Sequence, residues 1–195
     1  MKIATKGIAI AMALVAVTVV STQAQTAAGL PAGDKAADRV ALGAKFVQLG
    51  GCDDCHTTKK MGPNGPEPDM SQRLAGHPQA MVMPPAAQLP PGPWVATVAG
   101  TLTAWSGPWG VSFTANLTPD PETGLGKWTE AEFLAALQTG RHQGRGRQIL
   151  PPMPFPFIGT LTDTDLKAVF AFLQSIPAIA NKVPEPLPPS AHEMR

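Results

Sequence analysis

The residues best suited to chemistry are Cys52, Cys55 and His56, which lie in the run Gly-Cys-Asp-Asp-Cys-His at residues 51–56. Cys-x-x-Cys-His is the attachment pattern of c-type haem. Two thiols separated by two residues match the vinyl groups on one edge of the porphyrin, and the next residue is carried beneath the iron as its proximal axial ligand. The motif therefore predicts one covalently attached haem c, with Cys52 and Cys55 as thioethers and His56 on the iron.

Two other interpretations of these residues compete with haem. A Cys-x-x-Cys pair can be a thioredoxin-like dithiol, but no strand-then-helix pattern surrounds this one and two acids occupy its spacer. It can also be half of a zinc site, but the sequence has no second cysteine pair, and His77 and His142 lack zinc-finger spacing. Haem attachment also consumes the only two cysteines of the chain, which leaves no free thiol in an exported protein.

The preferred distal ligand is Met153, in the run Leu-Pro-Pro-Met-Pro-Phe-Pro-Phe at residues 150–157. Prolines on both sides fix the backbone and deny the methionine a helical role, and Phe155 and Phe157 are expected to form an apolar wall. A thioether held this rigidly suits an axial ligand. Methionine is more often a gap-filling core residue, and four others remain rivals, namely Met61, Met70, Met81 and Met83.

The first 24 residues predict an export signal. Lys2 and Lys6 form a charged start, residues 7–20 are almost wholly apolar, and residues 21–24 offer small side chains for cleavage. An uncleaved anchor is the alternative, but this apolar run is shorter than the ~20 residues that a membrane-spanning helix needs. We expect cleavage near Ala24 and a soluble, periplasmic mature chain, residues 25–195, without a transmembrane span.

Charge and composition narrow the class of protein further. The chain has 15 basic and 14 acidic residues, and loss of Lys2 and Lys6 makes the net charge of the mature part −1. Such a surface gives no reason to expect nucleic-acid binding. The 22 prolines and 19 glycines predict a loop-rich domain. A buried porphyrin would supply the apolar centre that such a domain otherwise lacks.

Apolar periodicity predicts three helices. The first covers residues 34–49, and its apolar stripe contains Gly43, where close approach of another helix, such as the last one, is expected. The second begins with a capping box at Thr129 and ends at Gly140. The third covers residues 163–176. One arginine of the basic turn between the last two helices could bind a haem propionate, although each of them singly is better explained as ordinary surface charge.

The rest of the chain is rich in loops. Residues 57–93 are predicted to be irregular, with a pair of lysines, Lys59 and Lys60, that could dock a partner but more often would form a solvated face. A short β-ribbon is predicted over residues 94–98, 101–105 and 111–115. Residues 57–115 thus form an insertion in a single domain, and the proline-rich tail at residues 177–195 is expected to be extended or loosely wrapped.

Several blocks together resemble a known family. Residues 43–56, 116–120, 124–137, 151–154 and 161–177 are similar to class I c-type cytochromes, especially the cytochrome c modules of bacterial alcohol and aldehyde dehydrogenases. The resemblance covers about residues 40–180. It implies a mainly α cytochrome c fold with crossing first and last helices, a haem-nucleated core, and His56 and Met153 as axial ligands. The dehydrogenase subunits typically carry three haem motifs, whereas this chain carries one.

These observations predict a monohaem electron carrier rather than an enzyme. With both axial positions filled, the iron offers no site for a substrate, and no catalytic residue is required. Its donor and acceptor would be redox proteins, a dehydrogenase or a terminal oxidase among them. Two alternatives stay open: a haem enzyme or sensor whose sixth iron position binds peroxide or a gas, and a fixed electron-transfer subunit of a dehydrogenase or oxidase complex.

Overall fold

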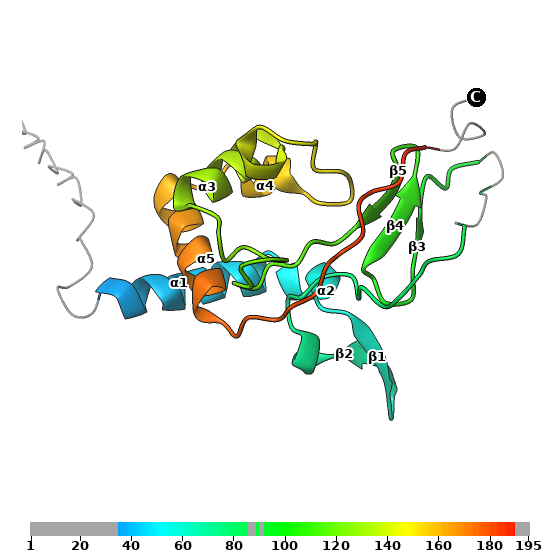
Figure 1. Ribbon diagram of the computed structural model, residues 1–195, viewed down its shortest axis with the longest axis horizontal. Coiled ribbons are helices and arrows are strands. Elements are labelled where there is room, and N and C mark those ends of the chain that lie inside the picture. Colours follow the sequence, from blue (N-terminus) through cyan, green and yellow to red (C-terminus); the bar gives the residue numbers. More distant parts are fainter. Residues whose placement is uncertain (1–34, 86–88, 90–91, 190–195) are drawn as a thin grey trace, which may run out of the picture. The chain divides into compact units, whose positions relative to one another are not determined.

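A computed structural model describes residues 35–85, 89 and 92–189 (Figure 1). The predicted export signal at residues 1–24 lies outside the described residues, as does Asp34, the predicted first residue of the first helix. Within the described ranges the chain forms helices and two small antiparallel sheets. None of the helices in these ranges has the length and apolar character needed to cross a membrane.

The first and last helices, α1 (Lys35–Leu49) and α5 (Asp163–Ser175), pack directly against each other (Figure 1). They meet at Gly43, where a Cβ would overlap the carbonyl oxygen of Ala168 and lie 2.8 Å from the Cβ of Phe172. The close approach predicted at Gly43 is therefore confirmed. Only glycine lets the two backbones come this near, which explains why a weak helix former lies in the middle of α1.

Helix α3 (Glu130–Thr139) completes the helical layer (Figure 1). It begins with the predicted capping box between Thr129 and Glu132, and it ends at Gly140, whose φ of 67° is left-handed. The predicted apolar faces of α3 and α5 are buried. The core cluster consists of Val47, Leu74, Leu125, Phe133, Leu134, Leu137, Leu166, Val169, Phe170, Phe172 and Leu173.

The predicted ribbon is a three-stranded antiparallel sheet of β3 (Thr97–Val98), β4 (Ala104–Gly107) and β5 (Gly110–Phe113), in that order. A second hairpin, β1 (Lys59–Gly62) with β2 (Gly65–Pro68), lies where the sequence predicted only irregular chain. That prediction was wrong.

The hairpin forms because residues 63–64, Pro-Asn, make a two-residue turn between paired glycines, and Gly65 takes a φ of 116°. Pro66 and Pro68 fit β2 because in this two-stranded sheet one edge of the strand makes no ladder hydrogen bonds.

Four short helical segments complete the description: the helices α2 (Cys52–His56) and α4 (Phe155–Ile158), and two 3-10 turns, η1 (Met70–Gln72) and η2 (His142–Gly144). Helix α4 was not predicted, because prolines surround it. It forms since Pro154 precedes the helix and Pro156 lies within its first turn, where a missing N–H is tolerated.

The tail is fixed to the domain rather than loose. The buried side chain of Asn181 donates hydrogen bonds to the carbonyl oxygens of Ala75 (2.6 Å) and His77 (2.9 Å), and its Oδ1 accepts one from the backbone N–H of Gln79 (2.9 Å). Further along, Leu187 pairs with Val111 in an isolated antiparallel bridge. The tail is extended, as predicted, and the loose wrapping also considered is wrong.

Candidate haem-binding site

The motif residues lie on the short helix α2 (Cys52–His56), which follows α1 after a sharp turn. Gly51 makes this turn with a φ of 63°, a left-handed conformation that favours glycine. Cys52, Cys55 and His56 occupy positions i, i+3 and i+4, so they share one face of the helix. Both thiols are free and half-buried, and Cys52 packs against the core cluster. The helix thus carries both thiols and the imidazole within about one and a half turns.

An ion pair holds this helix in place. Arg73 donates two hydrogen bonds to Asp53, from Nε to Oδ1 (2.9 Å) and from Nη2 to Oδ2 (2.8 Å), and Thr57 donates a third (3.0 Å). The guanidinium also lies 5.6 Å from the ring centre of Phe172 on α5. Hydrogen bonding from Arg73 lowers the pKa of Asp53 below its usual value. Asp53, a spacer residue in the motif, therefore anchors α2 to the loop of Arg73.

A hydrogen bond at one ring nitrogen of His56 prepares the second ring nitrogen for metal binding. Its ring is buried, and Nδ1 lies 2.8 Å from the carbonyl oxygen of Ala115. A carbonyl can only accept, so Nδ1 carries the proton and Nε2 keeps its lone pair. Burial lowers the pKa of His56, although the hydrogen bond to Ala115 opposes this shift. The imidazole is therefore neutral at pH 7, which is the form that binds iron.

The thiols differ from those of a redox dithiol. Burial, followed by the charge of Asp53, raises the pKa of Cys52 to about 11, and burial followed by the charge of Asp54 raises that of Cys55. Catalytic dithiols need a lowered pKa. Among the residues that the structure describes, no three His, Cys, Asp or Glu side chains are grouped to hold a metal ion. The raised pKa values of the two thiols therefore weigh against the dithiol interpretation.

The other two described histidines are engaged elsewhere. His77 is fully buried, with Nδ1 2.9 Å from the hydroxyl of Thr103 and Nε2 3.1 Å from the carbonyl oxygen of Met81. Both of its nitrogens are thus occupied, which makes it a structural residue. His142 is exposed on η2 and packs edge-on against Trp128, with ring centres 4.8 Å apart.

Met153 lies in the loop before α4. Its side chain is half-buried against the core cluster, and its backbone N–H donates to the carbonyl oxygen of Leu150 (3.3 Å). The carbonyl of Pro151 accepts a hydrogen bond from the hydroxyl of Ser112 on β5 (2.6 Å). Ala115, which holds His56, follows β5 by two residues. One continuous segment, β5 and the residues after it, therefore positions both the Met153 loop and the proximal histidine.

One detail of the predicted apolar wall is wrong. Phe155 packs over Gly140, but the side chain of Phe157 is 80% exposed. The two residues lie two apart on a helix, α4, and therefore point in different directions.

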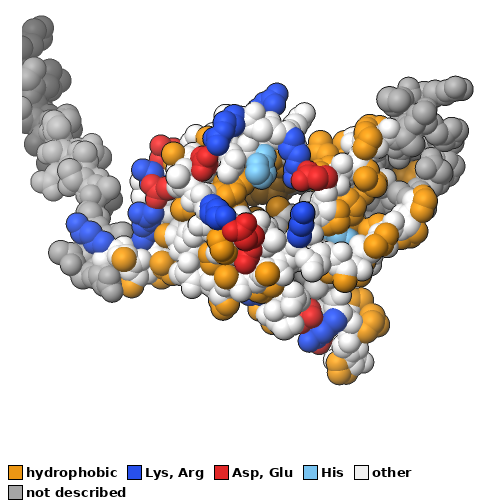
Figure 2. Space-filling model, viewed as in Figure 1, with side chains coloured by type: hydrophobic (Ala, Val, Ile, Leu, Met, Phe, Trp, Pro, Cys, Tyr) orange, Lys and Arg blue, Asp and Glu red, His pale blue; other side chains and the backbone are white. Residues whose placement is uncertain are grey.

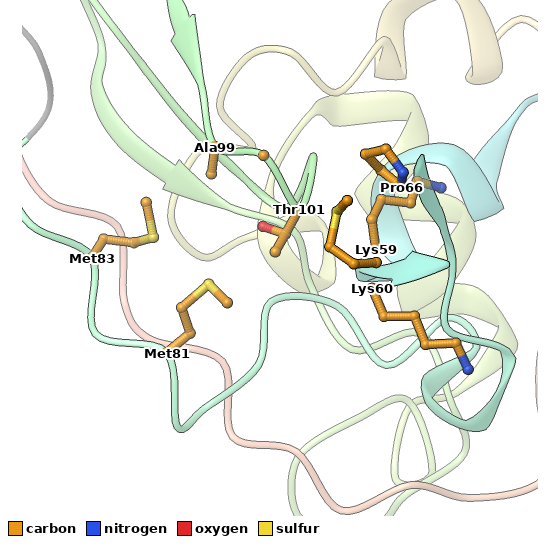
Figure 3. A pocket seen from close by; sticks show the side chains of 9 residues that line it. Lys59, Lys60, Pro66, Met81, Met83, Ala99 and Thr101 are labelled. Carbon is orange, nitrogen blue, oxygen red and sulfur yellow. The ribbon is translucent and has the colours of Figure 1, made fainter. Parts of the chain in front are cut away.

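Three of the rival methionines line a different place. Met61, Met81 and Met83 surround an open cavity of about 420 Å³ together with Lys59 and Lys60 (Figure 3). Figure 3 shows Met81 and Met83 extending into it from one loop, while the nitrogen of Lys60, which pairs with Asp69 at 3.5 Å, points away. The fourth rival, Met70, is 60% exposed. Of the five candidates, Met153 is the one that packs on the core.

Figure 2 shows a hollow on the face of the molecule seen in that view, with apolar side chains inside it and basic, acidic and histidine side chains around it. The donor set fits haem c: two free thiols at the attachment spacing, followed by a neutral imidazole whose Nε2 has no hydrogen-bond partner among the residues that the structure describes.

Sequence reasoning did not find Arg73 or Ala115, the two residues that hold the motif. They lie 20 and 59 residues from their partners, and neither carries a local signal.

No model of a known protein family matches the chain. Part of it is 36% identical over 86 residues to one of the subunits of the nicotinate dehydrogenase of Pseudomonas putida, covering 44% of this chain and 7% of that protein. Over 81 residues it is 37% identical to the cytochrome c subunit of the quinone-dependent alcohol dehydrogenase of Gluconobacter oxydans, 40% of this chain and 17% of that subunit. The fructose dehydrogenase cytochrome subunit of Gluconobacter japonicus is 35% identical over 72 residues, 37% of this chain and 15% of the subunit. The chain thus matches less than a fifth of each relative.

Proposed function

We propose that this chain is a c-type cytochrome module that carries one covalently attached haem and passes single electrons between redox proteins. In this proposal Cys52 and Cys55 form the thioethers, His56 is the proximal ligand and Met153 the distal one. The observation that carries the proposal is the short helix α2, which carries two free thiols at the attachment spacing and, directly after them, a buried imidazole whose Nδ1 lies 2.8 Å from the carbonyl oxygen of Ala115. Similarity to cytochrome subunits of dehydrogenases supports electron transfer as the function.

We further propose that the fold is a class I cytochrome c fold. The packing of α1 on α5 through Gly43 supports this, because it brings the motif that follows α1 to the edge of the core. The two small sheets would then be additions within the predicted insertion at residues 57–115. In this proposal residues 25–195 form one domain, which the signal at residues 1–24 directs to the periplasm.

The bound haem would supply reversible one-electron chemistry at its iron. The protein's own residues would set its properties. Ala115 fixes the tautomer and orientation of His56, and the Asp53–Arg73 pair fixes the helix that carries it. Thioether ligation by Met153 and an apolar environment both favour the reduced iron and raise the reduction potential. No acid, base or nucleophile is assigned.

We propose a dehydrogenase as the partner, with the module working as part of a complex rather than as a free carrier. The names of the similar proteins support this. So does the exposed apolar surface: Met61, Val82, Trp94 and Val95 are 77%, 90%, 77% and 63% exposed. Trp94 and Val95 are adjacent in the chain, and exposed apolar patches mark interaction sites. Size-exclusion chromatography of native extract, read at the haem absorbance, tests it: elution with a dehydrogenase supports the complex, and elution at the size of the lone chain contradicts it.

The optical spectrum of the ferric protein tests the ligand assignment. Methionine ligation gives a weak sulfur-to-iron band near the red end of the spectrum. Met153→Ala should abolish this band, lower the reduction potential and open a site for cyanide, whereas the matched variant Met83→Ala should leave all three unchanged. If Met153→Ala leaves the spectrum unchanged, another residue is the ligand. A high-spin spectrum in the unaltered protein would favour the peroxide- or gas-binding alternative.

A further inference from the structure

Three methionines, Met61, Met81 and Met83, line the cavity of about 420 Å³ shown in Figure 3, and none of them belongs to the core cluster. Met61 is 77% exposed, Met81 is 37% exposed, and Met83 is half-buried. Methionine in a folded protein usually fills gaps in the core. Core packing therefore does not account for three such side chains around one open cavity.

Met81 and Met83 reach the cavity from the same stretch of chain. Pro84 follows Met83 and favours an extended backbone there. In an extended chain, residues two apart point to the same side and the residue between them points to the other. Val82 is accordingly 90% exposed, while Figure 3 shows the thioethers of Met81 and Met83 extending into the cavity. Met61, on strand β1, adds a third methionine from a different element.

A buried chain of hydrogen bonds fixes the backbone at Met81. His77 Nε2 lies 3.1 Å from the carbonyl oxygen of Met81, and His77 Nδ1 lies 2.9 Å from the hydroxyl of Thr103. Burial lowers the pKa of His77, so the ring is neutral at pH 7. Because a carbonyl only accepts, Nε2 carries the proton, and Thr103 donates to Nδ1. Thr103 Oγ1 then accepts from the hydroxyl of Thr101, 2.8 Å away, which lines the cavity. Two parts of the lining are thus joined through His77 before any ligand binds.

The donors and charges of the lining indicate which ligand fits. Thioether sulfur is a soft donor that suits Cu(I), whereas magnesium, calcium and manganese ions prefer carboxylate, carbonyl and water oxygens. Among the described residues that line the cavity, Lys59 and Lys60 are charged and no acid is present. Positive charges nearby disfavour a divalent cation more strongly than a monovalent one. The nitrogen of Lys60 points away from the cavity and pairs with Asp69, so it does not compete for the thioethers. The lining therefore suits a soft ion with a single positive charge.

We propose that Met61, Met81 and Met83 form a binding site for one Cu(I) ion, held by their three thioether sulfurs. This inference goes beyond the proposed function and uses none of the residues assigned to the haem. Methionine side chains are flexible, so the sulfurs close on the ion while the backbone at Met81 stays fixed. The ion enters and leaves as Cu(I), with no change of oxidation state. Binding releases no proton from the ligands, because a thioether carries none, whereas thiol and imidazole ligands must be deprotonated.

The test is anaerobic titration of the haem-loaded, ferrous protein with Cu(I), in competition with a chelator of known affinity. We expect one Cu(I) per chain. Met81→Leu and Met83→Leu keep an apolar side chain of similar volume. Each should weaken binding more than about tenfold, since loss of even a residue that supports a metal ligand costs about 10–100-fold. Met70→Leu is the matched control, because Met70 is 60% exposed and is not among the residues that line the cavity. It should bind Cu(I) as tightly as the unaltered protein.

Haem attachment removes the two cysteine thiols as competing ligands. If the chain attaches no haem, the same titration on the variant with Cys52→Ala and Cys55→Ala keeps the copper site testable, so the inference and the proposed function fail separately.

Spectroscopy identifies the ligands of the bound ion. The ε-methyl NMR signals of Met61, Met81 and Met83 should shift together as Cu(I) is added, while that of Met70 stays in place. X-ray absorption at the copper edge should show sulfur neighbours. The inference is overturned if the leucine variants bind as tightly as the unaltered chain, if the neighbours of copper are nitrogen or oxygen, or if no stoichiometric binding occurs.

Discussion

Replacing Gly43 by alanine tests how the two helices that frame the core are held together. A methyl group there would overlap the carbonyl oxygen of Ala168 and crowd the Cβ of Phe172, and real Cβ atoms almost never come within 3.0 Å of another heavy atom. Since a backbone carbonyl cannot rotate away, α1 and α5 would have to separate by about 1 Å, which loosens the contacts along their whole interface.

Two effects of this substitution oppose each other. Alanine favours the helix over glycine by about 1 kcal/mol. Overpacking of a tight core costs about 1–3 kcal/mol, and a clash with backbone belongs at the upper end of that range. We therefore expect Gly43→Ala to lower the free energy of unfolding by about 2 kcal/mol, and to lower the melting temperature by roughly 4–8 °C for a domain of this size.

The assay is denaturant unfolding of the haem-loaded protein, followed by far-ultraviolet circular dichroism. The midpoint should fall while the slope with denaturant stays constant. Gly100→Ala is the matched control, because a Cβ at Gly100 meets nothing within 4 Å. Its stability should stay within about 0.5 kcal/mol of the unaltered chain. The reasoning is refuted if Gly43→Ala is as stable as the unaltered protein or more stable, since propensity would then outweigh the contact.

Two further substitutions probe the contacts that hold the site. Arg73→Met removes both hydrogen bonds to Asp53 and should lower stability at pH 7 by about 1–2 kcal/mol. This loss is smaller than that expected for a fully buried ion pair, because both side chains are partly exposed to solvent. The pair lowers the pKa of Asp53 in the folded state, so its contribution is present above about pH 4 and is lost as the pH falls through the folded value. The difference between the unfolding curves at pH 7 should therefore shrink as the pH falls below about 4. A difference that does not shrink with falling pH would contradict the ion-pair account. Asn181→Leu breaks three hydrogen bonds to backbone groups, two of them buried, and should lower stability by about 2–4 kcal/mol, measured by thermal unfolding. A loss below about 0.5 kcal/mol would mean that the tail is not fixed by this residue.

Local signals in the sequence predicted much of the helical structure. The capping box at Thr129 and the terminal glycine at Gly140 each depend on residues within four positions of one another, and each is present. Gly43 was informative for a different reason. A poor helix former inside an apolar stripe has few explanations other than close packing.

Contacts between distant segments could not be predicted in the same way. Asp53 was noted as a spacer acid, but nothing near it identified Arg73 as its partner 20 residues later. Asn181 lies in a proline-rich tail that gave no sign of being anchored 104 residues back at His77. The exposure of Phe157 was missed because the short helix α4 was not foreseen, and only that helix separates its direction from that of Phe155.

The most direct test of the central claim is whether haem stays attached to the denatured protein. The chain is produced in a host that can form haem thioethers, denatured, extracted with acidified acetone, and assayed as the pyridine haemochrome. We expect one haem per chain to remain with the protein, and Cys52→Ala combined with Cys55→Ala to release it into the solvent. Colour that leaves the unaltered protein on extraction, or a chain that gains none in such a host, would contradict covalent attachment and with it the electron-transfer role.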